Sequence, residues 1–262
     1  MAGLLTGRVA IVTGGGKGLG KVLCLALAEE GADIVVAGRT PEPLETVAGA
    51  VRALGRKSLA VPTDVTSEEQ VVNLVNVTLE QLGRVDILIN NAATITRFEP
   101  IVQTSLETWN HALAANLTSA MLCSRECIKP MSANGKGAII NMVGTSGKRA
   151  VPYMAPHSAS KFGLVGLTQA MALETAAMGI RINAVCPGGI EGEQRDEIYR
   201  LMAARMGEAD AAKSLASRST TTHTGQTVTP QEISKLVVFL VSDLSEPITG
   251  QSQIISRGGD MY

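Results

Sequence analysis

The sequence predicts an α/β protein built on one wide parallel sheet, and three observations point to it. Short apolar, β-branched runs alternate with stretches of helical periodicity along the chain, as in strands joined by crossover helices. These runs are seven in number, which is enough for a single sheet. No repeat, low-complexity tract or linker divides the 262 residues. We therefore expect a single doubly wound domain over residues 1–262, with a seven-stranded parallel sheet flanked by helices.

The expected strands are short segments rich in Val, Ile, Leu and Ala. In chain order they are 8–13, 33–37, 58–62, 85–90, 137–143, 180–186 and 251–256. Helix starts are indicated by a Thr followed three residues later by a Glu, which is the spacing of a capping box. The pairs are Thr66 with Glu69, Thr104 with Glu107, and Thr229 with Glu232. Pro230 fits a first helical position, where a missing N–H is tolerated.

One segment interrupts the alternation of strands and helices. Residues 189–228 are far longer than a usual connection between a strand and a helix. Because the segment follows the carboxyl end of a strand, where open α/β sheets bind their ligands, we interpret it as a substrate lid. A surface excursion or a contact between subunits is the alternative.

Composition excludes several classes of function. The 23 Lys and Arg nearly balance the 24 Asp and Glu, so the chain lacks the basic excess of a nucleic-acid-binding protein. No apolar run approaches the roughly 18–20 residues that span a bilayer, and the N-terminus lacks a cleavable signal pattern. The four cysteines are too few for a disulfide framework, and Cys123 with Cys127 is interpreted as a buried apolar pair rather than a metal site. We expect a cytoplasmic protein that binds a small molecule and no metal, membrane or nucleic acid.

A glycine-rich turn follows the first expected strand. It reads TGGGKGLG over residues 13–20 and leads into a helix-compatible stretch. Glycines between a strand and a helix let backbone N–H groups approach a pyrophosphate at the positive end of that helix. The spacing is Gly-x3-Gly-x-Gly rather than the general Gly-x-Gly-x-x-Gly, so its weight comes from the strand before it and the helix after it. The sequence therefore predicts a Rossmann-type dinucleotide site, with expected contacts at Gly14, Gly16, Lys17, Gly18 and Leu19.

The end of the second expected strand favours NADP(H) over NAD(H). An NAD-specific site has an acidic side chain there for the ribose 2′-hydroxyl, whereas this chain reads AGRT over residues 37–40. Arg39, together with Lys17, can neutralise a 2′-phosphate through charge-assisted hydrogen bonds. The alternative is that both are ordinary solvated cations. We expect Arg39 and Thr40 to contact the cofactor.

With these motifs the chain resembles the short-chain dehydrogenase/reductase family, from about Gly7 to Gly259. Further matching pieces are Asp64-Val65, Asn90-Asn91-Ala92-Ala93, Asn116, Ser160-Lys161, Pro187-Gly188 and Gly258-Gly259. The resemblance implies an oxidoreductase with a nicotinamide cofactor. The cofactor contacts that it implies, from adenine to nicotinamide, are Asp64, Val65, Asn91, Ala92, Ala93, Lys161, Pro187, Gly188 and Ile190. In the family pattern Asp64 holds the adenine amino group, Lys161 the nicotinamide ribose, and the Ile190 backbone the carboxamide.

The catalytic motif departs from the family's pattern. The family has Tyr-x3-Lys, with a catalytic Ser thirteen residues before the Tyr. Here His157 occupies the Tyr position four residues before Lys161, and Gly144 occupies the Ser position, while Asn116 and Lys161 are retained. Imidazole has a reference pKa of about 6.5, which suits proton transfer near neutral pH. We therefore expect His157, Lys161 and Asn116 to form the catalytic set.

The substituted motif lacks the hydroxyl groups of the family's Ser and Tyr, and three side chains close to it in the sequence carry a hydroxyl group. Thr145 and Ser146 directly follow Gly144, and either one replaces the lost hydroxyl or both only hydrogen-bond the turn. Tyr153 comes four residues too early, and pairing it with Lys161 would require a different helix register. We expect Tyr153 to have a packing role.

Three functions stay open on the sequence. The first is hydride transfer between NADP(H) and a carbonyl or secondary alcohol, with His157 in place of Tyr. The second is a non-redox reaction such as isomerisation at a retained cofactor site. The third is a catalytically silent dinucleotide-binding protein. Because Lys161 also serves cofactor binding, its presence favours an enzyme only weakly.

The resemblance also implies a homodimer or homotetramer. The expected contacts are made by helices at about 105–130 and 157–177, whose apolar faces exceed what one face of a sheet needs. The apolar residues expected at this interface are Leu113, Leu117, Leu122, Leu164, Leu167 and Met171.

Overall fold

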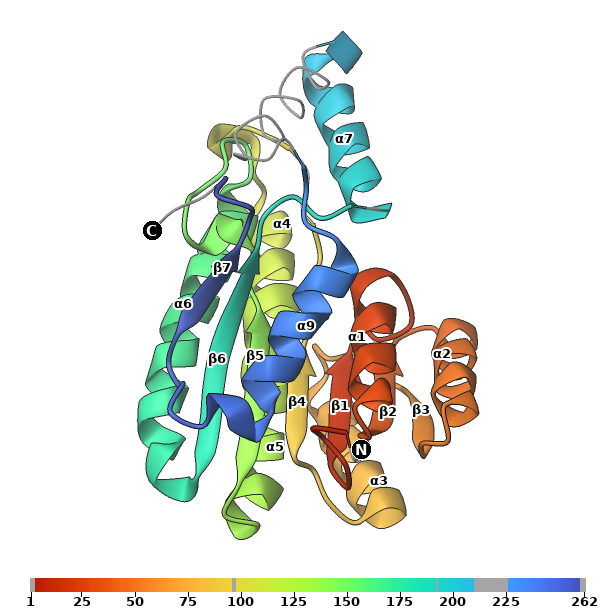
Figure 1. Ribbon diagram of the computed structural model, residues 1–262. Coiled ribbons are helices and arrows are strands. Elements are labelled where there is room, and N and C mark those ends of the chain that lie inside the picture. Colours follow the sequence, from red (N-terminus) through yellow and green to blue (C-terminus); the bar gives the residue numbers. More distant parts are fainter. Residues whose placement is uncertain (1–2, 96–97, 192, 210–225, 260–262) are drawn as a thin grey trace.

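The computed structural model describes residues 3–95, 98–191, 193–209 and 226–259. Within these ranges seven parallel strands form one sheet in the order β3-β2-β1-β4-β5-β6-β7 (Figure 1). The strands are β1 (Val9–Thr13), β2 (Asp33–Gly38), β3 (Ser58–Pro62), β4 (Ile87–Asn90), β5 (Gly137–Met142), β6 (Ile180–Pro187) and β7 (Ser252–Ile255). The expected seven-stranded parallel sheet is confirmed. The largest shift of a strand end is at β4, which begins at Ile87 rather than at residue 85.

The sheet is buried on both faces because helices cover each of them. Along β1, Ala10 and Val12 belong to one apolar cluster while Val9 and Ile11 belong to the other. This alternation follows from the period of two of a strand, and it explains why the strands read as continuous apolar runs.

Seven helices of the described ranges pack on the sheet or lie beside it. The first cluster is covered by α1 (Gly18–Glu29), α2 (Pro41–Ala53) and α9 (Pro230–Val241). The opposite face is covered by α3 (Glu68–Leu82), α5 (Ser119–Ala133) and α6 (Ala155–Thr175), with α4 (Leu106–Leu113) packed against α6. In Figure 1, α1 and α9 cross in front of the sheet. None of the described helices combines the length and apolar character that a membrane span requires.

Helix caps confirm one of the three expected capping boxes and correct the other two. Thr229 and Glu232 form a complete box at the start of α9. The caps of α3 and α4 are Ser67 and Ser105 instead, one residue beyond the expected Thr66 and Thr104. The Thr66 hydroxyl instead donates to Asp64 Oδ1 at 2.7 Å, and the Ser67 side chain accepts from the Gln70 N–H at the start of the helix. The hydroxyl of Thr104 lies 3.4 Å from the Pro100 carbonyl, which it faces across a preceding 3₁₀ turn.

The helix expected at 105–130 is divided by a π-helical turn. This turn, η2 (Ala114–Thr118), joins α4 to α5 and contains the buried Asn116. A π turn widens the backbone by one residue and is frequent at functional sites. It carries the Asn116 amide to the carboxyl end of the sheet.

The apolar faces expected between subunits are largely used within the subunit. Leu122, Leu164 and Met171 are buried in the core, and the other three expected residues are half-buried. Periodicity identifies an apolar face but does not tell whether that face meets the chain's own sheet. The expectation is therefore corrected for Leu122, Leu164 and Met171. For Leu113, Leu117 and Leu167 it stays a prediction. The large apolar side chains that point outward near these helices are Leu106, Phe162 and Leu173.

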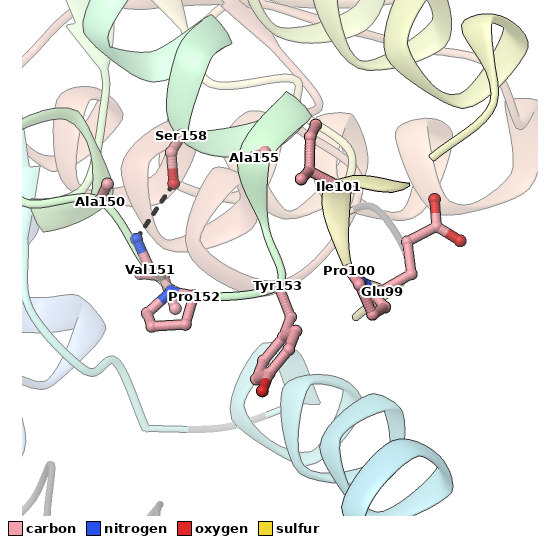
Figure 2. Close-up of a pocket in the computed structure, with 9 residues that line it drawn as sticks. All are labelled: Glu99, Pro100, Ile101, Ala150, Val151, Pro152, Tyr153, Ala155 and Ser158. Carbon is pink, nitrogen blue, oxygen red and sulfur yellow. Dashed lines mark hydrogen bonds between the residues drawn. The ribbon is translucent and has the colours of Figure 1, made fainter. Parts of the chain in front are cut away.

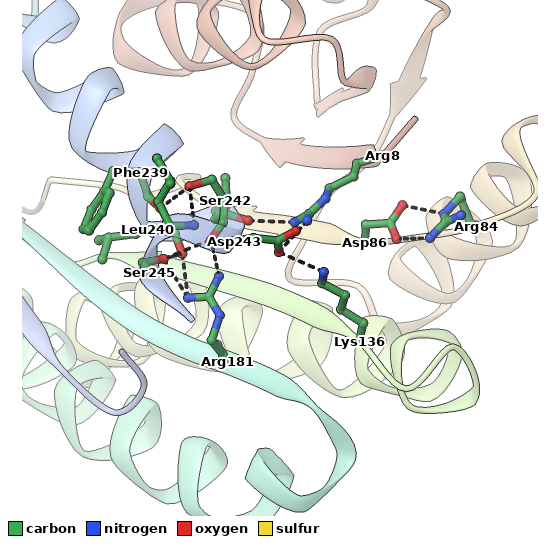
Figure 3. Close-up of polar contacts among 12 residues, drawn as sticks. Arg8, Arg84, Asp86, Lys136, Arg181, Phe239, Leu240, Ser242, Asp243 and Ser245 are labelled. Atoms are coloured by element: carbon green, nitrogen blue, oxygen red, sulfur yellow. Dashed lines mark hydrogen bonds and ion pairs between the residues drawn. The ribbon is translucent and has the colours of Figure 1, made fainter. Parts of the chain in front are cut away.

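At the amino ends of the strands, polar contacts connect β1, β5, β6 and the end of α9 (Figure 3). Asp243 accepts from Lys136 at 2.8 Å and from Arg8 at 2.6 Å, and these bonds hold the pKa of the Asp243 carboxyl below its usual range. Arg181 donates to the carbonyls of Leu240 and Ser242 at 2.8 and 3.0 Å. A cation that binds the last carbonyls of a helix also complements its dipole. These contacts therefore tie the amino ends of the strands to the end of α9, around a cavity of about 600 Å³ lined by Arg8, Lys136, Arg181 and Asp243.

The segment expected to form a lid includes α7 (Glu193–Met206), which lies beyond the carboxyl ends of the strands in Figure 1. Met202 is buried against Phe98 and Met154 in a small apolar cluster. At the two ends of the segment, Ile190 pairs with Val228 in an isolated β-bridge. Residues 192 and 210–225 lie outside the described residues.

The corrected caps predict a difference between two neighbouring substitutions. Ser105→Ala removes the acceptor of the Thr108 N–H, which lies 3.0 Å away, and we expect it to lower the free energy of unfolding by about 1 kcal/mol. Thr104→Ala, the matched control, should cost less than about 0.5 kcal/mol. Urea unfolding of both variants measures the difference. A larger loss for Thr104→Ala would contradict this assignment of the cap.

Candidate functional site

The glycine turn forms a cradle of backbone between β1 and α1. Gly14 has φ of +64°, and a Cβ added to Gly20 would lie 2.0 Å from the Gly14 carbonyl oxygen. Only glycine at both positions allows the helix to approach the turn this closely. Lys17, at the start of α1, makes no side-chain cap, so the first N–H groups of the helix stay available. An uncapped helix N-terminus behind a glycine turn fits a bound pyrophosphate.

Asn91 and Ala92 hold this turn in place from the end of β4. The Asn91 amide nitrogen donates to the carbonyls of Thr13 and Gly14 at 3.0 and 3.2 Å. The backbone N–H groups of Asn91 and Ala92 both donate to the Thr13 hydroxyl at 3.0 Å. The structure therefore places both residues beside the turn and gives the Asn91 side chain a structural use that the resemblance did not indicate. Their contacts with a cofactor stay a prediction.

The expected adenosine end has one carboxylate and two exposed cations. Asp64 Oδ1 accepts from the Thr66 N–H and hydroxyl at 3.0 and 2.7 Å, and these bonds hold the pKa of the Asp64 carboxyl below its usual range. The positive charge of Arg39 acts in the same direction. Lys17 and Arg39 are exposed, and the described part of the chain gives neither of them an ion pair. Thr40 is exposed beside Arg39, and Val65 is buried behind Asp64.

The expected nicotinamide end follows β6. Pro187 is buried, and the Gly188 N–H donates to the Ile255 carbonyl at 2.9 Å. A Cβ on Gly188 would lie 3.0 Å from Ser256 Cβ, so a side chain at this position would require Ser256 to shift by a few tenths of an ångström. Ile190 packs against the core at the start of the lid segment.

Helix α6 presents His157 and Lys161 to the carboxyl end of β5. Both are buried, with 9% and 4% of their surface exposed. The Lys161 ammonium donates to the Met142 carbonyl at 2.9 Å. Burial lowers the pKa of Lys161 to about 8. Burial and the charge of Lys161 lower the pKa of His157 to about 4, against a smaller opposing contribution from its bond to Thr94. The imidazole is therefore neutral at physiological pH.

Asn116 reaches His157 through the backbone of Thr94. Its side-chain oxygen accepts from the Thr94 N–H at 2.8 Å, and its side-chain nitrogen donates to the Thr94 carbonyl at 3.2 Å. The same nitrogen donates to Ser160 on α6 at 3.1 Å. The Thr94 carbonyl in turn lies 3.3 Å from His157 Nδ1. The expected catalytic set is thus brought together, with Thr94 as a member that sequence reasoning missed because a backbone carbonyl carries no side-chain signal.

Of the two hydroxyl residues after Gly144, Ser146 is the one that meets the imidazole. The 3₁₀ turn η3 (Thr145–Gly147) places Ser146 Oγ 3.2 Å from His157 Nε2. We name His157, Lys161, Asn116, Thr94 and Ser146 the His157 cluster.

Tyr153 lies apart from the His157 cluster. The residue is 46% exposed, and Figure 2 shows its ring pointing toward α7, where Arg205 lies 6.0 Å from the ring centre. Its φ of +64° is unusual for a bulky residue. The Tyr153 backbone lines a shallow cavity of about 530 Å³ with Pro100, Ile101, Ala150, Val151 and Pro152. The structure therefore places Tyr153 beside α7 and apart from the His157 cluster, and its packing role stays a prediction.

Comparisons with known proteins identify the family of this chain. The family model described as short chain dehydrogenase matches residues 8–243. An uncharacterized oxidoreductase of Thermotoga maritima is 34% identical over 256 residues, covering 97% of this chain and 96% of the relative. The cis-4-hydroxycyclohexanecarboxylate dehydrogenase of Sinomonas cyclohexanicum is 33% identical over 251 residues, covering 96% of each chain.

Two solved structures share the whole fold. NAD⁺-bound xylitol dehydrogenase has a TM-score of 0.93 at 29% identity and covers 97% of this chain and 99% of its own. A variant of actinorhodin polyketide ketoreductase with NADPH has a TM-score of 0.92 at 31% identity and covers 100% of both chains. With the family model matched over most of its length, this chain belongs to the short-chain dehydrogenase family of nicotinamide-dependent oxidoreductases.

Proposed function

We propose that this protein is an NADP(H)-dependent oxidoreductase that transfers hydride between the nicotinamide and a carbonyl or secondary alcohol, and that it favours alcohol oxidation. The observation that carries the proposal is the neutral His157 imidazole, buried beside Lys161 at the family's proton-transfer position. The family, the relatives named as dehydrogenases and the two cofactor-bound structures support the reaction class.

The chemistry divides between the cofactor and the His157 cluster. The oxidised nicotinamide, when bound, supplies the hydride acceptor. His157 takes the proton that leaves the substrate hydroxyl, because its neutral ring has a free lone pair above pH about 4. The Lys161 ammonium stabilises the negative charge that develops on the substrate oxygen. Asn116 orients the imidazole through Thr94.

The direction follows from the protonation state of His157. Carbonyl reduction requires an acid, and at pH 7 a group with a pKa of about 4 is protonated in roughly one molecule in a thousand. Alcohol oxidation requires a base, and that form is present throughout the physiological range. A base of such low pKa is weak, so slow turnover is expected.

The lid segment at 189–228 completes the substrate site in this proposal. Its helix α7 contacts the rest of the protein through Met202, which packs against Phe98 and Met154. Closure of such a helix over a bound substrate would exclude water from the site. The partner is therefore a small-molecule substrate held between the His157 cluster and α7.

Cofactor preference gives a first test. NADPH should bind on the order of ten to a few hundred times more tightly than NADH, because Lys17 and Arg39 are exposed and without ion pairs in the described part of the chain. Arg39→Ala should remove most of this preference. Lys21→Ala, an exposed lysine one turn along α1, is the control and should leave it unchanged. Calorimetry that finds equal affinities in the natural chain would overturn the NADP(H) assignment.

The role of His157 is tested by His157→Asn, whose amide still donates to the Thr94 carbonyl but has no basic atom. We expect NADP⁺-dependent oxidation of secondary alcohols to be lost while NADPH affinity is retained. Oxidation by the natural chain should fall as the pH drops through about 4, where His157 gains a proton, and as the pH rises through about 8, where Lys161 loses one.

The steady-state assay distinguishes three descriptions of the site. Full activity in His157→Asn would make the histidine a bystander. A single step near pH 6.5 would mean that the imidazole is solvated rather than buried. If the natural chain binds NADPH and yet oxidises no alcohol and reduces no carbonyl, a silent or non-redox protein is the correct description.

We also propose that the protein forms a homodimer or homotetramer through α4 and α6. Leu173 is 83% exposed and Leu106 is 72% exposed, and such side chains on a helix surface favour association. Leu173→Glu should lower the mass measured by light scattering at micromolar concentration. Gln169→Glu, an exposed position one turn away, is the control. A natural chain that is monomeric under these conditions would rule out the assembly.

A further inference from the structure

The loop after β5 begins with a backbone conformation at residue 144 that glycine adopts readily. Gly144 has φ of +85°, in the left-handed region that L side chains rarely adopt. A side chain at residue 144 would not clash with its neighbours, because the nearest atom to its Cβ would be Ser146 Oγ, at 3.6 Å. The backbone conformation, rather than crowding, therefore disfavours a serine at residue 144.

The path of the loop brings the next hydroxyl into the site. The Gly147 N–H donates to the Gly144 carbonyl at 3.1 Å, which closes the turn η3 directly after the glycine. A Cβ on Gly147 would lie 2.3 Å from Val143 Cγ1 and 2.8 Å from the Lys161 carbonyl, so the turn is pressed against α6. Ser146 is held between these two glycines, at hydrogen-bond distance from His157.

The contacts of the imidazole assign its tautomer. The Thr94 carbonyl can only accept, so the proton of the neutral ring is on Nδ1. Nε2 then carries a lone pair, and the Ser146 hydroxyl, 3.2 Å away, donates to it. An oxygen that donates its own hydrogen still has two lone pairs with which to accept another. Ser146 is half-buried, and its Oγ is therefore able to accept from a substrate hydroxyl.

We propose that Ser146 is the catalytic hydroxyl of this protein, and that it contacts the substrate oxygen and relays the substrate's proton to His157 Nε2. The proposal rests on the function proposed above and adds the residue that replaces the hydroxyl missing at Gly144. A structural role, in which Ser146 only holds the ring, is the competing interpretation.

The relay balances in atoms and electrons. The carbinol C–H leaves as hydride to the oxidised nicotinamide. The substrate O–H bond breaks, its electron pair forms the second bond of the carbonyl, and its proton bonds to Ser146 Oγ. Ser146 simultaneously passes its own proton to His157 Nε2 and ends as a neutral hydroxyl. His157 ends as an imidazolium with Nδ1–H still on Thr94, and releases one proton to solvent.

Charge around the ring sets how long the imidazolium persists. Lys161 faces it from the same helix, whereas Thr94, Asn116 and Ser146 contribute only neutral groups. No carboxylate among the described residues is paired with His157. The imidazolium therefore releases its proton readily, which suits oxidation.

Kinetics of Ser146→Ala test the relay. We expect kcat for alcohol oxidation to fall about 10²- to 10³-fold with NADPH affinity unchanged, as for loss of one positioned hydrogen-bonding group. Ser146→Thr keeps a hydroxyl and should recover most of the rate. Thr145→Ala, in the same turn, is the matched control and should stay within about threefold of the natural rate. In mixtures of H₂O and D₂O, the natural chain should show two protons in flight and Ser146→Ala one.

Nitrogen NMR of His157 adds a readout that does not depend on turnover. The relay requires a neutral ring protonated on Nδ1, with an Nε2 signal that shifts in Ser146→Ala. A ring protonated on Nε2 overturns the relay whether or not a substrate is found. If Ser146→Ala keeps full oxidation while His157→Asn loses it, the proposed function stands and the relay fails. If His157→Asn keeps full activity, or if the natural chain turns over no substrate, the proposed function and the relay fail together.

Discussion

The Thr94 carbonyl is the acceptor on which the arrangement of the site depends. It lies in the loop after β4 and receives hydrogen bonds from Asn116 in the π turn and from His157 on α6. Three segments that are distant in the sequence are thereby fixed by one oxygen. Because a carbonyl cannot donate, it also decides which ring nitrogen of His157 is free. The geometry of the backbone, rather than any acidic side chain, sets the chemistry of the imidazole.

Burial then sets the charge of the two ionisable groups. His157 and Lys161 lie on one face of α6, one turn apart, and each loses water on folding. Burial lowers both pKa values, and the ammonium lowers that of the imidazole further. The Lys161 charge would lower the pKa of a tyrosine at residue 157 as well, but by stabilising its charged form, whereas it destabilises the charged form of His157. At the same place in the fold, a tyrosine would have acid character, whereas the neutral imidazole of His157 acts only as a base.

The sequence was sufficient for the sheet because strands such as β1 and β2 are apolar on both faces. Each of these two strands differs from its expected range by one residue at an end. The sequence did not predict the N-cap of α3 correctly. The Thr66 hydroxyl binds Asp64, and Ser67 caps the helix instead. The sequence also misjudged Leu164, because periodicity does not reveal which partner an apolar face meets. Ser146 could be named as a candidate but not chosen, since the choice depends on the φ of Gly144.

The π turn at Ala114–Thr118 has a consequence for how the chain can change in length. It accommodates one residue more than a regular helix would need between the same two ends. Deleting a single residue there would restore an ordinary α-helix between the same two ends, with α4 and α5 left in phase. Asn116 would then lie on a regular helical turn, and its amide would lose the position from which it bonds to Thr94. Over evolutionary time this stretch should therefore tolerate exchange of side chains and resist the loss of a residue, because the extra residue of the turn is what presents Asn116.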